Sequence, residues 1–100
     1  MPGHPRFHEL LEEIRMLHNR KNADYSKEND PLSNFYMCEQ FGIPAWKGCL
    51  VRISDKVSRV FNLAAKEGKA EVESESIIDT LKDLAVYSLI CVVLYEKACG

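Results

Sequence analysis

The sequence predicts an all-α single domain, and three observations support this prediction. Apolar residues recur at spacings of three and four along most of the chain, which is the period of an amphipathic helix. No segment shows the strict alternation of apolar and polar residues that marks a half-buried strand. The prolines and most of the glycines fall between the periodic segments and separate four expected helices. We therefore expect residues 1–100 to form one four-helix bundle.

The N-terminal half is expected to contain one long helix and one short helix. The long helix would begin near Pro5 and end near Lys21. The polar stretch Asn22–Ser33 is rich in turn formers and is predicted to be a loop. Asp30–Pro31 is suited to cap and start the short helix, which would end at Gly42. Its apolar residues would be Leu32, Phe35, Tyr36, Cys38 and Phe41.

The third helix is predicted over about Ala45–Lys66 and is opened by Pro44. Asp55 stands nearly opposite the centre of the apolar side of this helix. The apolar side consists of Trp46, Cys49, Leu50, Ile53, Val57, Val60, Phe61 and Ala64. Three basic residues follow one another along the flank, and we call them the basic row: Arg52, Lys56 and Arg59.

The fourth helix contains the longest apolar run and a regular row of acids. Glu75, Asp79 and Asp83 recur at spacings of four on one face, and we call them the acidic row. Val86 and Ile90 continue that face, so the acids are expected to point toward the core. Carboxylates on a buried face need a counter-charge, and a divalent metal ion is the usual one.

Leu84–Tyr95 is apolar on nearly all sides, which is typical of a helix at the centre of a bundle or at a subunit interface. We therefore expect a homodimer or a homotetramer. The segment is shorter than the roughly 20 residues that cross a bilayer, so no membrane partner is expected.

Composition limits the partners further. The chain has 13 Lys+Arg against 15 Asp+Glu and a net charge of −2, so no direct nucleic-acid binding is expected. The four cysteines show no close pairing such as C-x-x-C, which is typical of reduced thiols in a cytoplasmic protein.

Three stretches, read together, resemble a known family: Arg20–Ser26, Arg52–Arg59 and Glu75–Tyr87. They resemble the nucleotide-modification-associated domain of phages and bacteria, which is similar to the MazG-like all-α nucleoside triphosphate pyrophosphatases. The resemblance extends over about residues 7–95. It implies a helical, usually oligomeric bundle in which acids from neighbouring helices hold magnesium and the metal holds a nucleoside triphosphate.

The resemblance implies a magnesium- or manganese-dependent pyrophosphohydrolase of phage or bacterial nucleotide metabolism. It would convert a nucleoside or deoxynucleoside triphosphate into the monophosphate and pyrophosphate. The candidate catalytic residues are Glu75, Asp79 and Asp83, which together with Asp55 are also the candidate metal ligands. The candidate substrate-binding residues are Lys21, Asp24, Tyr25, Arg52, Lys56 and Arg59.

The chain also departs from the MazG-like pattern of two acidic pairs, E-x-x-E and E-x-x-D, on neighbouring helices. The basic row stands where the first pair is expected, and Asp55 is the acid on that helix. Structural roles stay open: Glu75 and Asp79 can stabilise a helix start, Asp55 can be a solvated charge, and Asp24 can form a turn. The alternative function is a non-catalytic, dimerising helical protein, or a nucleotide-binding accessory to a DNA-modifying enzyme.

Overall fold

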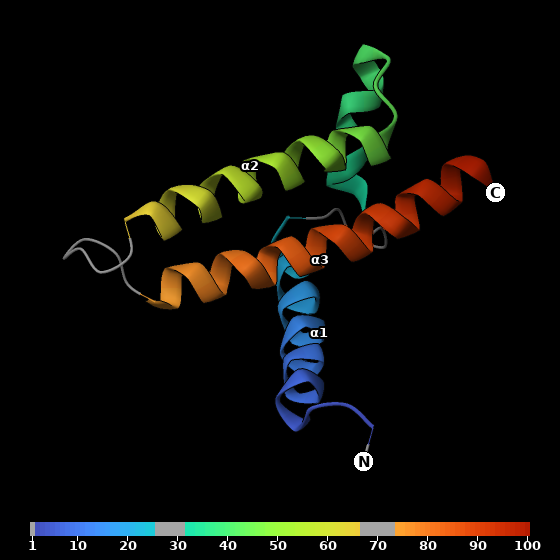
Figure 1. Ribbon diagram of the computed structural model, residues 1–100. Helices are drawn as coiled ribbons and strands as arrows, with labels where there is room; N and C mark the ends of the chain where they lie inside the picture. Colours follow the sequence, from blue (N-terminus) through green and yellow to red (C-terminus); the bar gives the residue numbers. More distant parts are fainter. Residues whose placement is uncertain (1, 26–31, 67–73) are drawn as a thin grey trace.

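The computed structural model describes residues 2–25, 32–66 and 74–100, without the side chains of residues 21–25, 33, 74 and 75 (Figure 1). It contains the helices α1 (Pro5–Tyr25), α2 (Ala45–Ala65) and α3 (Ser74–Cys99), and the 3-10 helix η1 (Ser33–Phe41). No strand occurs within these ranges. The predicted all-α class is therefore confirmed.

Helices α2 and α3 form a hairpin and pack against each other along their lengths (Figure 1). The core lies where η1 and the start of α2 meet the second half of α3. Its apolar members, each almost fully removed from water, are Leu32, Phe35, Ala45, Cys49, Val86, Ile90 and Leu94. The apolar period that predicts α2 and α3 thus also supplies most of the residues that join them.

The short helix ends as predicted at Gly42. The backbone of Gly42 has φ 79°, a left-handed conformation that favours glycine. Its N–H bonds the carbonyl of Glu39 at 3.1 Å, and the N–H of Ile43 bonds the carbonyl of Cys38 at 3.3 Å. Pro44 follows as the N-cap residue of α2, also as predicted. The turn between η1 and α2 is therefore fixed by its own backbone, and the proposed Asp30–Pro31 cap lies outside the described residues.

The prediction of a loop from Asn22 is wrong for its first four residues, because α1 continues to Tyr25. Nothing between Asn22 and Tyr25 breaks a helix, since the segment contains neither glycine nor proline. Adding residues to an existing helix is much easier than starting one, so polar residues of moderate helix propensity can extend α1. The rest of the predicted loop lies largely outside the described residues. Helix α2 ends at Ala65 with Lys66 as its C-cap residue, close to the predicted end at Lys66.

Helix α1 projects away from the α2–α3 hairpin (Figure 1). Its main packing is against α3, to which Ile14 and Leu17 contribute part-buried apolar side chains. Lys82 of α3 donates to Oε1 of Glu13 at 2.8 Å, and Arg6 donates to Oε2 at 2.6 Å. The predicted four-helix bundle stays a prediction. No helix in the described ranges combines the length and apolar character needed to cross a membrane.

Candidate functional site

The basic row of α2 faces α3, and we call the contact between them the α2–α3 interface. Lys56 Nζ lies 3.2 Å from Asp83 Oδ2, forming an ion pair between the two helices. One turn further along, Arg59 Nε donates to Thr80 Oγ1 at 3.2 Å. Thr80 is buried and donates its own proton to the carbonyl of Ser76 at 2.7 Å. The second and third stretches of the resemblance therefore lie side by side.

Two aromatic rings hold the first part of the basic row in place. The Arg52 guanidinium lies 4.5 Å from the centre of the Phe35 ring, and Lys56 Nζ lies 6.0 Å from the centre of the Tyr87 ring. The rings of Phe35 and Tyr87 meet edge to face at 6.1 Å. A cation over an aromatic face is attracted by the ring quadrupole, which limits the orientations of Arg52 and Lys56. Arg52 and Lys56 are thus part of a packed interface, whereas Arg59 is more exposed.

The two described side chains of the acidic row, Asp79 and Asp83, differ in exposure. The side chains of Lys56 and Asp83 are 28% and 18% exposed, whereas Asp79 is an exposed residue. A step of four residues turns about 400° around a helix, so the row drifts by about 40° at each step. Asp83 points toward α2. The expectation that Asp79 faces the core is wrong, because the drift carries its side chain into solvent.

Lys56 already provides a counter-charge for Asp83. In a metal site, the carboxylates would bind a cation in addition to this pairing. Among the described residues, no three His, Cys, Asp or Glu side chains converge. Magnesium, however, is usually held by one or two carboxylates together with waters and substrate phosphates. Asp79 and Asp83, one turn apart, fit that smaller requirement. The side chain of Glu75 lies outside the described residues, and Asp55 is exposed on α2.

Three predicted substrate-binding residues lie at the C-terminal end of α1: Lys21, Asp24 and Tyr25. Their side chains are outside the described set. Their backbone is helical, which corrects the expectation that Asp24 and Tyr25 sit in a loop and the turn role considered for Asp24. The contacts of these three side chains stay a prediction.

The α2–α3 interface also contains polar groups that sequence reasoning missed. Cys49 Sγ donates to the carbonyl of Tyr87 at 3.4 Å, and Cys91 Sγ donates to the carbonyl of Trp46 at 3.6 Å. Burial, followed by the nearby Cys91, raises the pKa of the Cys49 thiol to about 11. All four cysteines are free thiols. We call Cys49 and Cys91 the thiol pair.

Thr80 was also missed, although the sequence contained a signal for it. A threonine in a helix can bond the carbonyl four residues earlier, which lets its hydroxyl be buried beside a donor from another helix. Thr80 makes this bond and accepts from Arg59.

These observations define an all-α chain in which a basic row and a partly buried carboxylate meet between two antiparallel helices. Comparison of the chain with protein-family models, with curated proteins and with solved structures found no match. The resemblance to the MazG-like enzymes therefore stays a prediction.

Proposed function

We propose that this chain is a magnesium-dependent nucleoside triphosphate pyrophosphohydrolase whose site lies on the α2–α3 interface. The observation that supports this proposal is the ion pair between Lys56 and Asp83 at 3.2 Å. It joins a candidate phosphate ligand to a candidate metal ligand. Phosphate recognition by cations and magnesium recognition by carboxylates must lie next to each other in such a site.

Each residue has a role that follows from its position. Asp79 and Asp83 would hold the metal, with Glu75 one turn before them and Asp55 from α2 as further candidates. A bound magnesium ion lowers the pKa of a water ligand and neutralises phosphate charge. The acidic row would also accept the proton from the attacking water.

The basic row would bind the triphosphate and stabilise the leaving pyrophosphate. Charge builds up on that group when the bond between the α- and β-phosphates breaks, and preorganised cations lower its free energy. Arg52 and Lys56 are already oriented by Phe35 and Tyr87. Arg59 is bonded to Thr80, so its position is also set before substrate arrives.

The ion pair has a consequence for the order of binding. Asp83 cannot serve the metal fully while it neutralises Lys56. A triphosphate offers Lys56 a second anionic partner, which releases Asp83 toward the metal. Metal and triphosphate should therefore strengthen each other's binding, and each should bind weakly alone.

The test is a screen of the common ribo- and deoxyribonucleoside triphosphates for pyrophosphate release, in magnesium and in EDTA. We expect at least one substrate in magnesium and none in EDTA. Asp83→Asn should lower the rate by about a hundredfold or more. Glu96→Gln is the matched control, because Glu96 is an exposed carboxylate near the far end of α3 and should keep the full rate. An equal rate of pyrophosphate release by Asp83→Asn and wild type would contradict the assignment of the site to the α2–α3 interface.

A second candidate is a helical protein that keeps the interface without catalysis. The observation that favours it is again Lys56, because it gives Asp83 a counter-charge without a metal. The two candidates differ in thermal melting. A metal–nucleotide complex at about 100 times its dissociation constant raises the free energy of unfolding by about 2.7 kcal/mol. If the interface is purely structural, magnesium and nucleotide should leave that free energy unchanged.

A further inference from the structure

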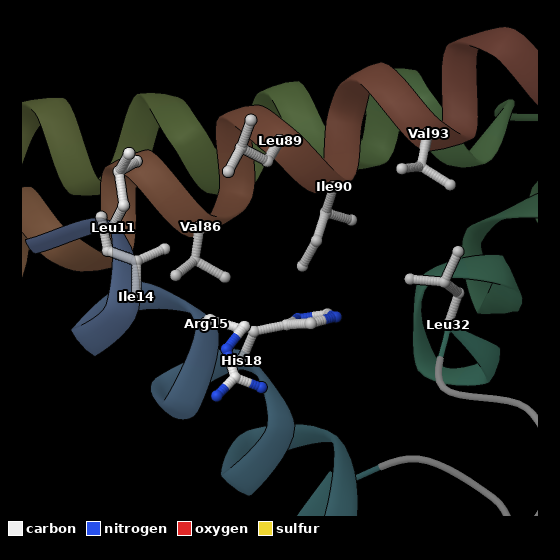
Figure 2. A pocket seen from close by; sticks show the side chains of 9 residues that line it. All are labelled: Leu11, Ile14, Arg15, His18, Leu32, Val86, Leu89, Ile90 and Val93. Atoms are coloured by element: carbon white, nitrogen blue, oxygen red, sulfur yellow. The ribbon is translucent and has the colours of Figure 1, made fainter. Parts of the chain in front are cut away.

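A hollow lies in the angle between α1 and α3, with Leu32 on a third side, and we call it the α1–α3 hollow (Figure 2). Its volume is about 440 Å³, which falls within the range of about 300–1,000 Å³ that small-molecule sites occupy. The side that α3 contributes is wholly aliphatic. It consists of four residues spaced by three and four along one face of the helix: Val86, Leu89, Ile90 and Val93.

Helix α1 contributes a side with two different halves. Its four lining residues also follow the spacing of three and four, so they share one face of α1: Leu11, Ile14, Arg15 and His18. The first two are aliphatic, and the last two are basic. Among the described residues that line the hollow, none is acidic. The α1–α3 hollow is therefore apolar with one basic edge.

The two basic side chains can donate hydrogen bonds to a ligand. Figure 2 shows the imidazole of His18 extending from α1 toward Leu32. Arg15 donates from Nε and Nη2 to the carboxylate of Glu12. A guanidinium has more N–H groups than one carboxylate can accept, and within the described part of the chain Nη1 of Arg15 has no acceptor. The basic edge thus has donors left for an anion.

The ion pair between Arg15 and Glu12 does not prevent such binding. The two side chains are 63% and 58% exposed, and an exposed ion pair contributes little to stability. Glu12 itself does not line the hollow. A ligand carboxylate whose chain is removed from water at the same time can therefore compete with Glu12 for the guanidinium.

We propose that the α1–α3 hollow binds a medium-chain aliphatic carboxylic acid, with the carboxylate at Arg15 and His18 and the chain between α1 and α3. Charge complementarity identifies the head group, because basic groups without an acid beside them favour an anion. The aliphatic side of α3 identifies the tail, because burial of methylene groups there is favourable. The inference is independent of the proposed hydrolysis, since it uses no residue of the basic or acidic rows.

Calorimetric titration of the full chain with hexanoate, octanoate and decanoate, each below its micelle concentration, tests the proposal. One molecule should bind per chain. Each methylene that enters the hollow should strengthen binding by up to about fourfold, so decanoate should bind at least about tenfold more tightly than hexanoate. Decyltrimethylammonium has a chain of the same length and the opposite charge, and it should bind at least about tenfold more weakly than decanoate.

Two variants locate the head and the tail of the ligand. Arg15→Gln should weaken decanoate binding by about tenfold and leave decyltrimethylammonium binding unchanged, because it removes the charged donor alone. Leu89→Gln should weaken both by a similar factor, because it puts an amide against the chain. Leu89 is 58% exposed, so the fold should tolerate this change.

Arg20→Gln is the matched control for Arg15→Gln. Arg20 is also an exposed arginine of α1 but does not line the hollow, so its replacement should leave decanoate binding unchanged. A wild-type chain that binds no decanoate up to about 1 mM would overturn the proposal. So would equal affinity for the two amphiphiles, or equal losses in Arg15→Gln and Arg20→Gln. If Arg15→Gln does not fold, Arg15→Lys keeps the charge and should retain most of the preference for decanoate over decyltrimethylammonium; loss of that preference would contradict the proposal.

Discussion

The two sides of α3 bind their neighbouring helices in different ways. Toward α2 the contact is buried and specific: an ion pair, one cation over an aromatic ring and two thiol–carbonyl bonds connect the helices. Toward α1 the contact depends on Glu13 between two cations and on part-buried apolar side chains, with open hollows on both sides. The first contact is therefore closed by buried polar and apolar groups. The second leaves large apolar side chains exposed beside it.

The largest effect expected from this contrast comes from two phenylalanines. Phe35 is 6% exposed in the core, whereas Phe7 is 58% exposed on α1. Phe35→Ala should lower the free energy of unfolding by about 3–5 kcal/mol, because it leaves a cavity and removes the ring beneath Arg52. Phe7→Ala should cost less than about 1 kcal/mol in the monomer. Urea unfolding at low protein concentration measures both, and equal losses would remove the distinction between the two contacts.

The rates of thiol modification should distinguish the buried α2–α3 interface from the exposed end of α3. Cys49 is 1% exposed and its pKa is raised to about 11, so only about 0.1% of it is thiolate at pH 8 even when reached by reagent. Cys99 is exposed. Iodoacetamide at pH 8, followed by peptide mass mapping, should modify Cys99 at least about a hundredfold faster than Cys49. Comparable rates in the native chain would show that the α2–α3 interface opens readily.

Replacing Lys56 by methionine should separate the structural and functional roles of the interface. The side chains of Lys56 and Asp83 are mostly buried, so the loss should cost about 1–2 kcal/mol, and the double variant with Asp83→Asn should recover part of it. Under the proposed function, Lys56→Met should also bind magnesium better without nucleotide and bind the triphosphate less well. Calorimetric titration measures both. Unchanged magnesium binding would mean that Asp83 does not serve the metal.

The smallest expected effect is the pH dependence of α1 packing. Hydrogen bonds from Lys82 and Arg6 lower the pKa of Glu13. A lowered pKa means that the folded state favours the carboxylate, so its contribution is complete above the ordinary glutamate pKa of about 4.3. The contribution is lost as the pH falls through the lower pKa of the folded chain. Amide exchange of α1 should rise over that range in the wild type, and Glu13→Gln should show the rise already at neutral pH.

Much of the hairpin could be predicted from sequence. Pro44 and the apolar period predict the start and the buried side of α2, and the regular period predicts α3. The end of α1 could not be predicted in the same way. Polar residues at Asn22–Tyr25 resemble a loop in composition, but helix continuation depends on the absence of a breaker.

The candidate site was only partly accessible from sequence. Helical spacing predicts that Asp83 points to the interior, but not that Lys56 will be its partner, because that depends on how α2 is rotated and shifted against α3. The position of α1 could not be predicted for the same reason, because it depends on how α1 packs against α3. Periodicity shows that a helix has an apolar side and does not say which neighbour, or which chain, covers it.

The reciprocal bonds of the thiol pair fix the alignment of α2 with α3 along the helix axes. Each thiol reaches a backbone carbonyl of the other helix, so neither helix can slide without losing both bonds. One turn forward from Lys56 to Arg59 then corresponds to one turn back from Asp83 to Thr80. A single residue inserted between Cys49 and Arg52 would turn the rest of α2 by about 100°. Such an insertion would separate all three residues of the basic row from their partners at once. Natural length variation in this chain is therefore expected outside these helices.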